Sequence, residues 1–190
     1  MITIRSIYFL IFLATFTVAL VGAGGYYYRR YRINQKSPYG NFESLLKKLS
    51  SVDRDNVAMI ARDLIDNSGQ WRVDEDDLDL DPSQIWPLID GLRGLEALER
   101  NCAVLVDLVF YVQQWYPEAL AVAEQLRLNS QEISWHVSRL QAAAKTGKLE
   151  TSFADNAQRA VATYYLMTRR VLAVYEQLNV PGLAELQRAL

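Results

Sequence analysis

The sequence predicts an all-α protein, with one N-terminal transmembrane helix followed by a cytoplasmic helical bundle of about five to six helices, three of them long or broken. Two observations predict this class. Residues 7–28 contain no ionisable group other than tyrosine phenols. After residue 41, the apolar residues recur at steps of three and four, which is the period of one helix face. No clear alternation of apolar and polar residues, typical of half-buried strands, accompanies them.

The chain divides into four parts on this interpretation. Residues 1–6 form a short N-terminal tail, 7–28 the transmembrane helix, 29–40 a basic juxtamembrane tether, and 41–190 an all-helical soluble domain with an acidic loop at 71–81. At about 1.5 Å per residue, the predicted helix reaches roughly 33 Å, enough to cross a hydrocarbon core of about 30 Å. We therefore expect the lipid bilayer to be a partner of this helix.

The flanks of the predicted span indicate its orientation. Tyrosine rings favour the membrane interface because they are apolar with a polar tip. One arginine precedes the span and four Lys or Arg residues follow it in the tether. Because positive charge is more frequent on the cytoplasmic side, this places the N-terminus outside the cell membrane and the C-terminal domain in the cytoplasm. The predicted anchor flanks are Arg5, Tyr8, Tyr26, Tyr27, Tyr28, Arg29, Arg30, Arg32 and Lys36.

Two further interpretations of this stretch stay open. Arg5, the apolar run 7–20 and the small residues 21–23 also match a cleaved signal peptide, although the basic tether is typical of a segment that stops transfer. Ala19 and Ala23 form a small-xxx-small pair that would let two such helices approach closely. A homodimer is therefore an alternative to a monomer.

Charge and rare residues restrict the function of the domain. All 22 acidic residues and 15 of the 20 basic residues follow residue 40, so residues 41–190 carry a net charge of 15 − 22 = −7. Because a phosphate backbone repels such a domain, we do not expect nucleic acid as a partner. The chain has one cysteine, Cys102, and one histidine, His136. A single residue of each kind cannot form a disulfide, a four-ligand zinc site or a nucleophile triad. We expect both residues to pack in the core. With no phosphate-binding glycine motif, the sequence predicts no enzyme and no cofactor.

The first two helices of the domain are predicted to be short. Asn41 caps the first, which places Phe42 and Leu45 on its apolar face. Asp53 caps the second, whose apolar face includes Val57.

The loop at 71–81 is strongly acidic. Three of its aspartates repeat the opening spacing of a calcium-binding EF-hand loop, but Pro82 stands where that loop needs glycine and Leu88 where it needs a bidentate glutamate. We therefore interpret the loop as a solvated strip that docks a basic partner, instead of a calcium site. The residues of this docking strip are Asp74, Glu75, Asp76, Asp77, Asp79 and Asp81.

A long helix is predicted after the acidic loop. Asp81 and Pro82 have the pattern of a helix start, and the apolar residues that follow keep one face for about 30 residues, as far as Tyr116. Residues 102–112 are apolar nearly all round but too few to span a bilayer, so we expect them to form the buried centre of the bundle.

Asp107 interrupts this apolar segment. A carboxylate in such a place is either buried, with Arg169 or Arg170 as its partner, or lies on the one solvated edge of the helix. Both interpretations stay open.

The remaining residues predict three more helical segments. A helix that starts after Pro117 is expected to break at the capping box of residues 129–132 and to end near residue 145. After a linker at 150–153, Asp155 caps a last long helix, and the C-terminal residues follow as a short tail.

Residues 121–140, AVAEQLRLNSQEISWHVSRL, resemble the two-helix core of bacterial helix-turn-helix repressors, particularly the winged-helix kind. The core positions of that motif are occupied by Ala123, Leu126, Leu128, Ile133, Val137 and Leu140, and its recognition helix would carry Ser134, Trp135, His136 and Arg139. The chain departs from the family at Arg127, where the turn usually has glycine, and in the absence of a wing hairpin pattern. The resemblance implies DNA binding.

These observations together predict a single-pass, membrane-anchored helical bundle that acts as a protein interaction or scaffold module, with a protein partner. Two alternatives remain. The first is a membrane-tethered DNA-binding regulator that uses residues 121–140, and the second is a small-molecule sensor with a pocket between helices.

Overall fold

The computed structural model describes residues 12–26, 41–66, 69–72 and 80–190, without the side chains of 150–152. The chain forms two compact units, residues 1–41 and 42–190. All regular secondary structure in the described residues is helical, so the predicted all-α class is confirmed.

In the first unit, residues 12–26 form a helix. The Phe12 and Phe16 rings stack with centroids 6.1 Å apart. No helix among the described residues is both long enough and apolar enough to cross a membrane. The structure therefore does not support the transmembrane helix predicted at 7–28. Part of that prediction, and every predicted anchor flank except Tyr26, lies outside the described residues.

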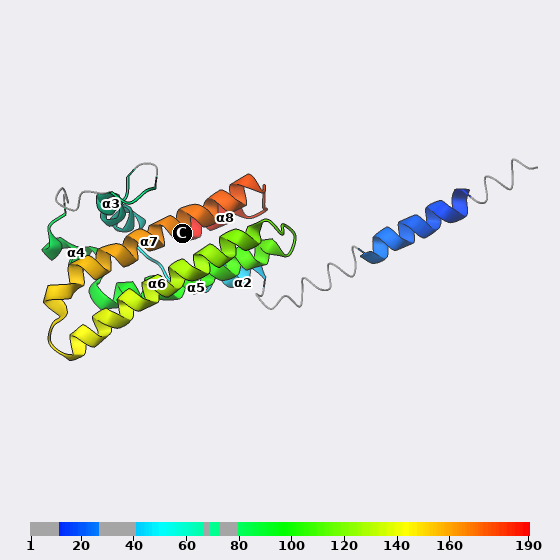
Figure 1. Ribbon diagram of the computed structural model, residues 1–190. Helices are drawn as coiled ribbons and strands as arrows, with labels where there is room; N and C mark the ends of the chain where they lie inside the picture. Colours follow the sequence, from blue (N-terminus) through cyan, green and yellow to red (C-terminus); the bar gives the residue numbers. More distant parts are fainter. Residues whose placement is uncertain (1–11, 27–40, 67–68, 73–79) are drawn as a thin grey trace, which may run out of the picture. The chain divides into compact units, whose positions relative to one another are not determined.

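The second unit contains seven helices in its described residues, against the five to six that the sequence predicts. They are α2 (Phe42–Leu46), α3 (Arg54–Leu64), α4 (Pro82–Ile89), α5 (Gly91–Gln113), α6 (Ala119–Lys145), α7 (Leu149–Gln177) and α8 (Leu183–Ala189). The long helices α5, α6 and α7 pack on one another, and α7 also contacts α3, α4 and α8 (Figure 1).

The core lies between the three long helices. Leu105 and Val109 of α5, Ile133 of α6 and Val171 of α7 are all fully buried. As predicted, most of the segment 102–112 is buried, because α5 is covered by α6, α7, α2 and α4.

Two predicted helix caps are confirmed. The Asp53 carboxylate accepts hydrogen bonds from the backbone N–H groups of Asp55 and Asn56, both at 3.0 Å, and so begins α3. The Asp81 carboxylate accepts one from Ser83 N–H at 2.9 Å and begins α4, which has Pro82 in its first turn. Short polar side chains that satisfy free N–H groups at a helix start explain both boundaries.

The single long helix predicted from 82 to 116 is wrong, because the chain breaks between α4 and α5. Asp90 and Gly91 both have positive φ angles, 60° and 58°. A Cβ on Gly91 would lie 2.6 Å from the Trp86 ring, so glycine is needed both for the conformation and for the space. The Asp-Gly pair was the sequence signal for this break.

Two other predicted boundaries are also wrong. α6 runs unbroken through residues 129–132, where a break was predicted. The predicted linker at 150–153 is part of α7, which begins at Leu149, so Asp155 lies inside the helix instead of capping it. Asp155 forms an ion pair with Arg159 one turn later, at 2.9 Å.

The beginning and the end of the second unit pack together. The Phe42 ring lies against Tyr175, with centroids 5.9 Å apart, and also covers Gly182, where a Cβ would come within 2.5 Å of it. The Arg54 guanidinium donates a hydrogen bond to the Gln187 carbonyl at 2.6 Å. These contacts attach α8 to α2 and α3.

Candidate functional site

The outer face of α6 exposes two large apolar side chains. Leu128 is 52% exposed and Trp135 is 53% exposed. They are seven residues apart, which is nearly two helical turns, and so lie on the same side of the helix. We call this side the α6 strip, which consists of Ala121, Glu124, Leu128, Glu132, Trp135 and Arg139, all of them exposed.

Charged groups surround the two apolar side chains of the α6 strip. The Glu124 carboxylate pairs with Arg127 at 2.8 Å. The Arg139 guanidinium lies over the Trp135 ring, 4.7 Å from its centroid, a cation–π contact that holds the indole in place at the surface. The strip is therefore an apolar surface on an ordered helix with residues of both charges beside it.

The inner face of α6 belongs to the core. Four of the six positions that the repressor resemblance assigns to a core are fully buried in α6, namely Ala123, Leu126, Ile133 and Leu140, and a fifth, Val137, is nearly so. The sixth, Leu128, is exposed, and the two helices of that motif are one continuous helix here.

The repressor resemblance places His136 on a recognition helix, whose side chains would contact DNA, but in this structure His136 is buried. It is only 5% exposed, and its Nδ1 lies 2.9 Å from the Asn156 side-chain oxygen of α7. The prediction that His136 packs inside the domain is confirmed. The fully buried Cys102 confirms the same prediction, and burial raises the pKa of its thiol.

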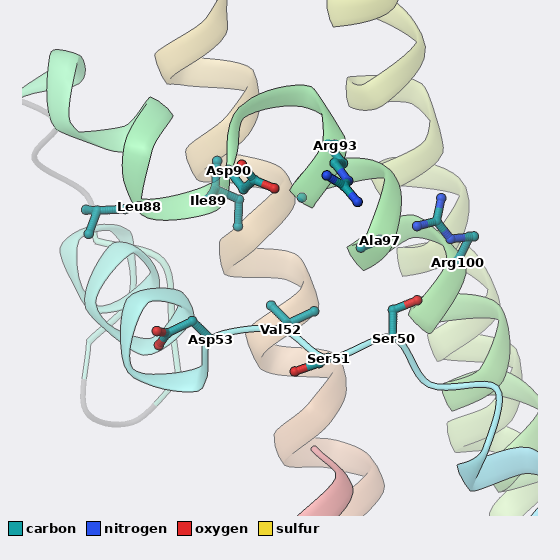
Figure 2. Close-up of a pocket in the computed structure, with 11 residues that line it drawn as sticks. Ser50, Ser51, Val52, Asp53, Leu88, Ile89, Asp90, Arg93, Ala97 and Arg100 are labelled. Atoms are coloured by element: carbon teal, nitrogen blue, oxygen red, sulfur yellow. The ribbon is translucent and has the colours of Figure 1, made fainter.

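A groove of about 440 Å³ lies where the segment before α3 and the end of α4 meet α5. Figure 2 shows two arginines of α5, Arg93 and Arg100, on one side of it, and Ser50 and Ser51 on the segment that faces them. The remaining lining residues are Val52, Asp53, Leu88, Ile89, Asp90, Gly94 and Ala97. No sequence pattern indicates this groove, because its residues come from three separate segments.

A buried amide fixes one wall of the groove. Asn101 of α5 is 1% exposed. Its side-chain oxygen accepts a hydrogen bond from Ser50 N–H at 2.7 Å, and its amide donates to the Ser50 carbonyl at 2.9 Å. Since both backbone groups of Ser50 are satisfied by one side chain, this wall is held at a fixed place beside Arg100.

The acidic docking strip is described only at Asp81. Asp74, Glu75, Asp76, Asp77 and Asp79 lie outside the described residues. Asp81 is the N-cap of α4, and the hydrogen bond from the Ser83 backbone lowers the pKa of its carboxyl. In the part of the chain that the structure describes, no three His, Cys, Asp or Glu side chains lie close enough to hold a metal ion.

Asp107 is half-buried on α5. Burial raises the pKa of its carboxyl above the ordinary 3.8, and the positive charge of Lys48 opposes this shift. The cation that acts on it is therefore Lys48 of the segment after α2, instead of Arg169 or Arg170.

The raised pKa of Asp107 predicts a pH-dependent stability difference. A carboxyl whose folded-state pKa is above its unfolded value binds its proton more tightly when folded, so ionisation destabilises the fold as pH rises through that pKa. We expect Asp107→Asn to match the wild type below pH 3.8 and to become more stable than it at higher pH. Urea denaturation between pH 3 and 7 measures this, and a wild-type advantage at pH 7 would contradict the direction.

Two polar residues of α7, Gln158 and Thr163, are buried. The Gln158 amide donates to the Asp63 carboxylate of α3 at 3.0 Å, and both residues are at most 6% exposed. Thr163 is 2% exposed, and its hydroxyl has no hydrogen-bond partner among the described residues.

Thr163→Val should therefore stabilise the fold by about 1 to 2 kcal/mol, because valine has the same shape without an unsatisfied hydroxyl. Thr168→Val is the matched control. The Thr168 hydroxyl donates to the Tyr165 carbonyl at 2.7 Å, so the same substitution should cost up to about 1 kcal/mol there. Equilibrium denaturation of both variants compares them, and a Thr163→Val variant less stable than wild type would show that this hydroxyl is satisfied.

Comparison of the chain with models of protein families, with curated proteins and with solved structures finds no match.

Proposed function

We propose that this chain is a single-pass membrane protein whose helical unit, residues 42–190, is a protein interaction module. The observation that carries the proposal is the α6 strip, where Leu128 and Trp135 are half exposed on a well-packed helix. Exposed apolar side chains grouped on one face, with charged residues beside them, are the usual composition of a docking surface. Tryptophan is also enriched among the residues that dominate binding energy.

The partner that fits this surface is a protein segment with an apolar ridge and basic flanks. Glu124 is paired with Arg127, and Glu132 and Arg139 lie beside the two apolar side chains. The preference for a basic partner comes from residues 41–190 as a whole, which carry a net charge of −7, from 15 basic and 22 acidic residues. A positively charged partner would gain attraction during approach, while an acidic one would be repelled. The acidic residues 74–81 would add to this preference.

The proposed anchor is residues 7–28, with the C-terminal unit in the cytoplasm. Its support is the absence of charged side chains from this stretch and the excess of arginine after it. A reporter enzyme that is active only outside the cytoplasm, fused after Leu190, tests the orientation and should give no signal. Extraction of membranes with alkaline carbonate tests the anchor, because an integral membrane protein stays in the membrane pellet after centrifugation. Release of the chain into the supernatant would contradict the anchor.

Affinity capture from detergent-solubilised membranes tests the docking surface. The full chain should retain a partner that the Leu128→Ser, Trp135→Ser double variant loses. Met59→Ser is the matched control, because Met59 is 50% exposed on α3, away from the α6 strip. Equal capture by all three proteins would contradict docking on α6. Salt-sensitive retention of DNA in place of a protein would instead favour the DNA-binding alternative.

A further inference from the structure

The groove beside α5 brings two arginine side chains to one space. Arg93 and Arg100 are seven residues apart on α5, so they lie on the same face with a rise of about 10 Å between them. Both are exposed, and in Figure 2 their guanidinium groups lie on the side of α5 that faces Ser50. An ion placed midway between them is within reach of both side chains.

The floor between the two arginines is flat. Gly94 and Ala97 line the groove, and Glu96, on the turn between the two arginines, accepts a hydrogen bond from Gln141 of α6 at 3.0 Å. Gly94 cannot be larger, because a Cβ there would lie 1.6 Å from the Ile89 carbonyl oxygen. Close packing of α4 against the start of α5 thus keeps the groove open.

Among the residues that the structure describes, no protein contact neutralises the two guanidinium groups. Within the described part of the chain, neither Arg93 nor Arg100 has an ion-pair or hydrogen-bond partner. The groove also contains Asp53, whose carboxylate is engaged in two backbone hydrogen bonds at the start of α3. Its other acid, Asp90, lies one turn before Arg93 and three turns from Arg100. The groove lining therefore has two arginines and two aspartates, and the part beside Arg100 and Ser50 is the part farthest along α5 from Asp90.

The wall opposite the arginines is rigid. Asn101 holds the backbone of Ser50 by two hydrogen bonds, so the Cα and Cβ atoms that carry the Ser50 hydroxyl have a fixed position at the groove. A site of this kind loses little conformational freedom when a ligand binds, which favours affinity.

We propose that this groove binds a phosphomonoester group. Two guanidinium forks and a hydroxyl offer more donors than the two oxygens of one carboxylate can accept. A phosphomonoester has three terminal oxygens and nearly two negative charges at neutral pH, which matches both the donors and the charge. This site is independent of partner docking on α6.

Isothermal titration calorimetry of the full chain in neutral detergent, with glycerol 3-phosphate as the probe, tests the site. At constant ionic strength, we expect saturable binding that Arg93→Ala and Arg100→Ala each weaken by about tenfold or more. Arg170→Ala is the matched control. Arg170 is exposed on α7 and does not line the groove, so this substitution removes the same charge at a different place. Methyl sulfate, with a similar shape and one charge, should bind more weakly.

Three outcomes would overturn the proposal. The first is that glycerol 3-phosphate shows no saturable binding. The second is that Arg170→Ala weakens its binding as much as Arg93→Ala and Arg100→Ala do. The third is that methyl sulfate binds as tightly as glycerol 3-phosphate. Two sources of the phosphate group are distinguished by a second titration with dihexanoyl phosphatidic acid. Affinity equal to that of glycerol 3-phosphate indicates a soluble metabolite. An affinity at least about tenfold higher that is lost in Arg100→Ala indicates a lipid headgroup.

Discussion

Replacing Leu105 with alanine should lower the free energy of unfolding by about 2 to 5 kcal/mol. Leu105 is fully buried in α5, where α6 and α7 surround it. Truncation removes three carbon atoms from the core and leaves a cavity that the packed helices fill only in part. Val109→Ala, one turn later, removes less volume and should cost somewhat less.

Leu128→Ala is the matched control for this prediction, because it is the same substitution on a helix at a residue that is 52% exposed. It should change the free energy of unfolding by less than about 0.5 kcal/mol. Urea denaturation followed by circular dichroism gives both values. If Leu128→Ala were the more damaging change, α6 would have its outer and inner faces exchanged, and the α6 strip would be part of a core.

Gly94→Ala should destabilise the fold by about 3 kcal/mol or more. A Cβ at this position would lie 1.6 Å from the Ile89 carbonyl oxygen and 2.8 Å from its carbon. Both are backbone atoms that no rotamer change can move, so the junction between α4 and α5 would have to separate.

Gly147→Ala separates this clash from the general cost of losing glycine. Gly147 has φ +71° but no atom within 4 Å of its ideal Cβ, so alanine there has only backbone strain, about 1 kcal/mol. Thermal unfolding of the two variants should therefore differ clearly. Equal melting temperatures would mean that α4 does not pack against the start of α5 as described.

Local interactions explain what the sequence predicts correctly. The caps at Asp53 and Asp81 depend on atoms two or three residues away, so a short pattern identifies them. The burial of Leu105 and Val109 follows from the helical period of their segment.

Two errors come from local signals that compete with one another. At Asp90 and Gly91 the leucine period continues across a turn, so the period alone predicts an unbroken helix although the backbone turns there with positive φ angles. At residues 129–132 a capping pattern occurs inside a helix. There the Asn129 side chain accepts a hydrogen bond from Gln125, one turn earlier, at 3.1 Å, instead of capping a new helix.

The groove could not be predicted from the sequence. Ser50 and Asn101, which build its rigid wall, are 51 residues apart, and no local pattern joins them. The position of Arg93 and Arg100 on one helix face is visible in the sequence, but the segment that faces them is set by tertiary packing alone.

Site-specific photo-crosslinking in intact membranes tests the interaction surface most directly. A photoreactive amino acid at position 135 lies on the α6 strip, and one at position 59 lies on an equally exposed place of α3. If a partner docks on the α6 strip, position 135 gives a discrete crosslinked protein that is absent from position 59 and is reduced by Leu128→Ser. Crosslinks from position 59 alone, or none from position 135, would contradict docking of a partner on α6.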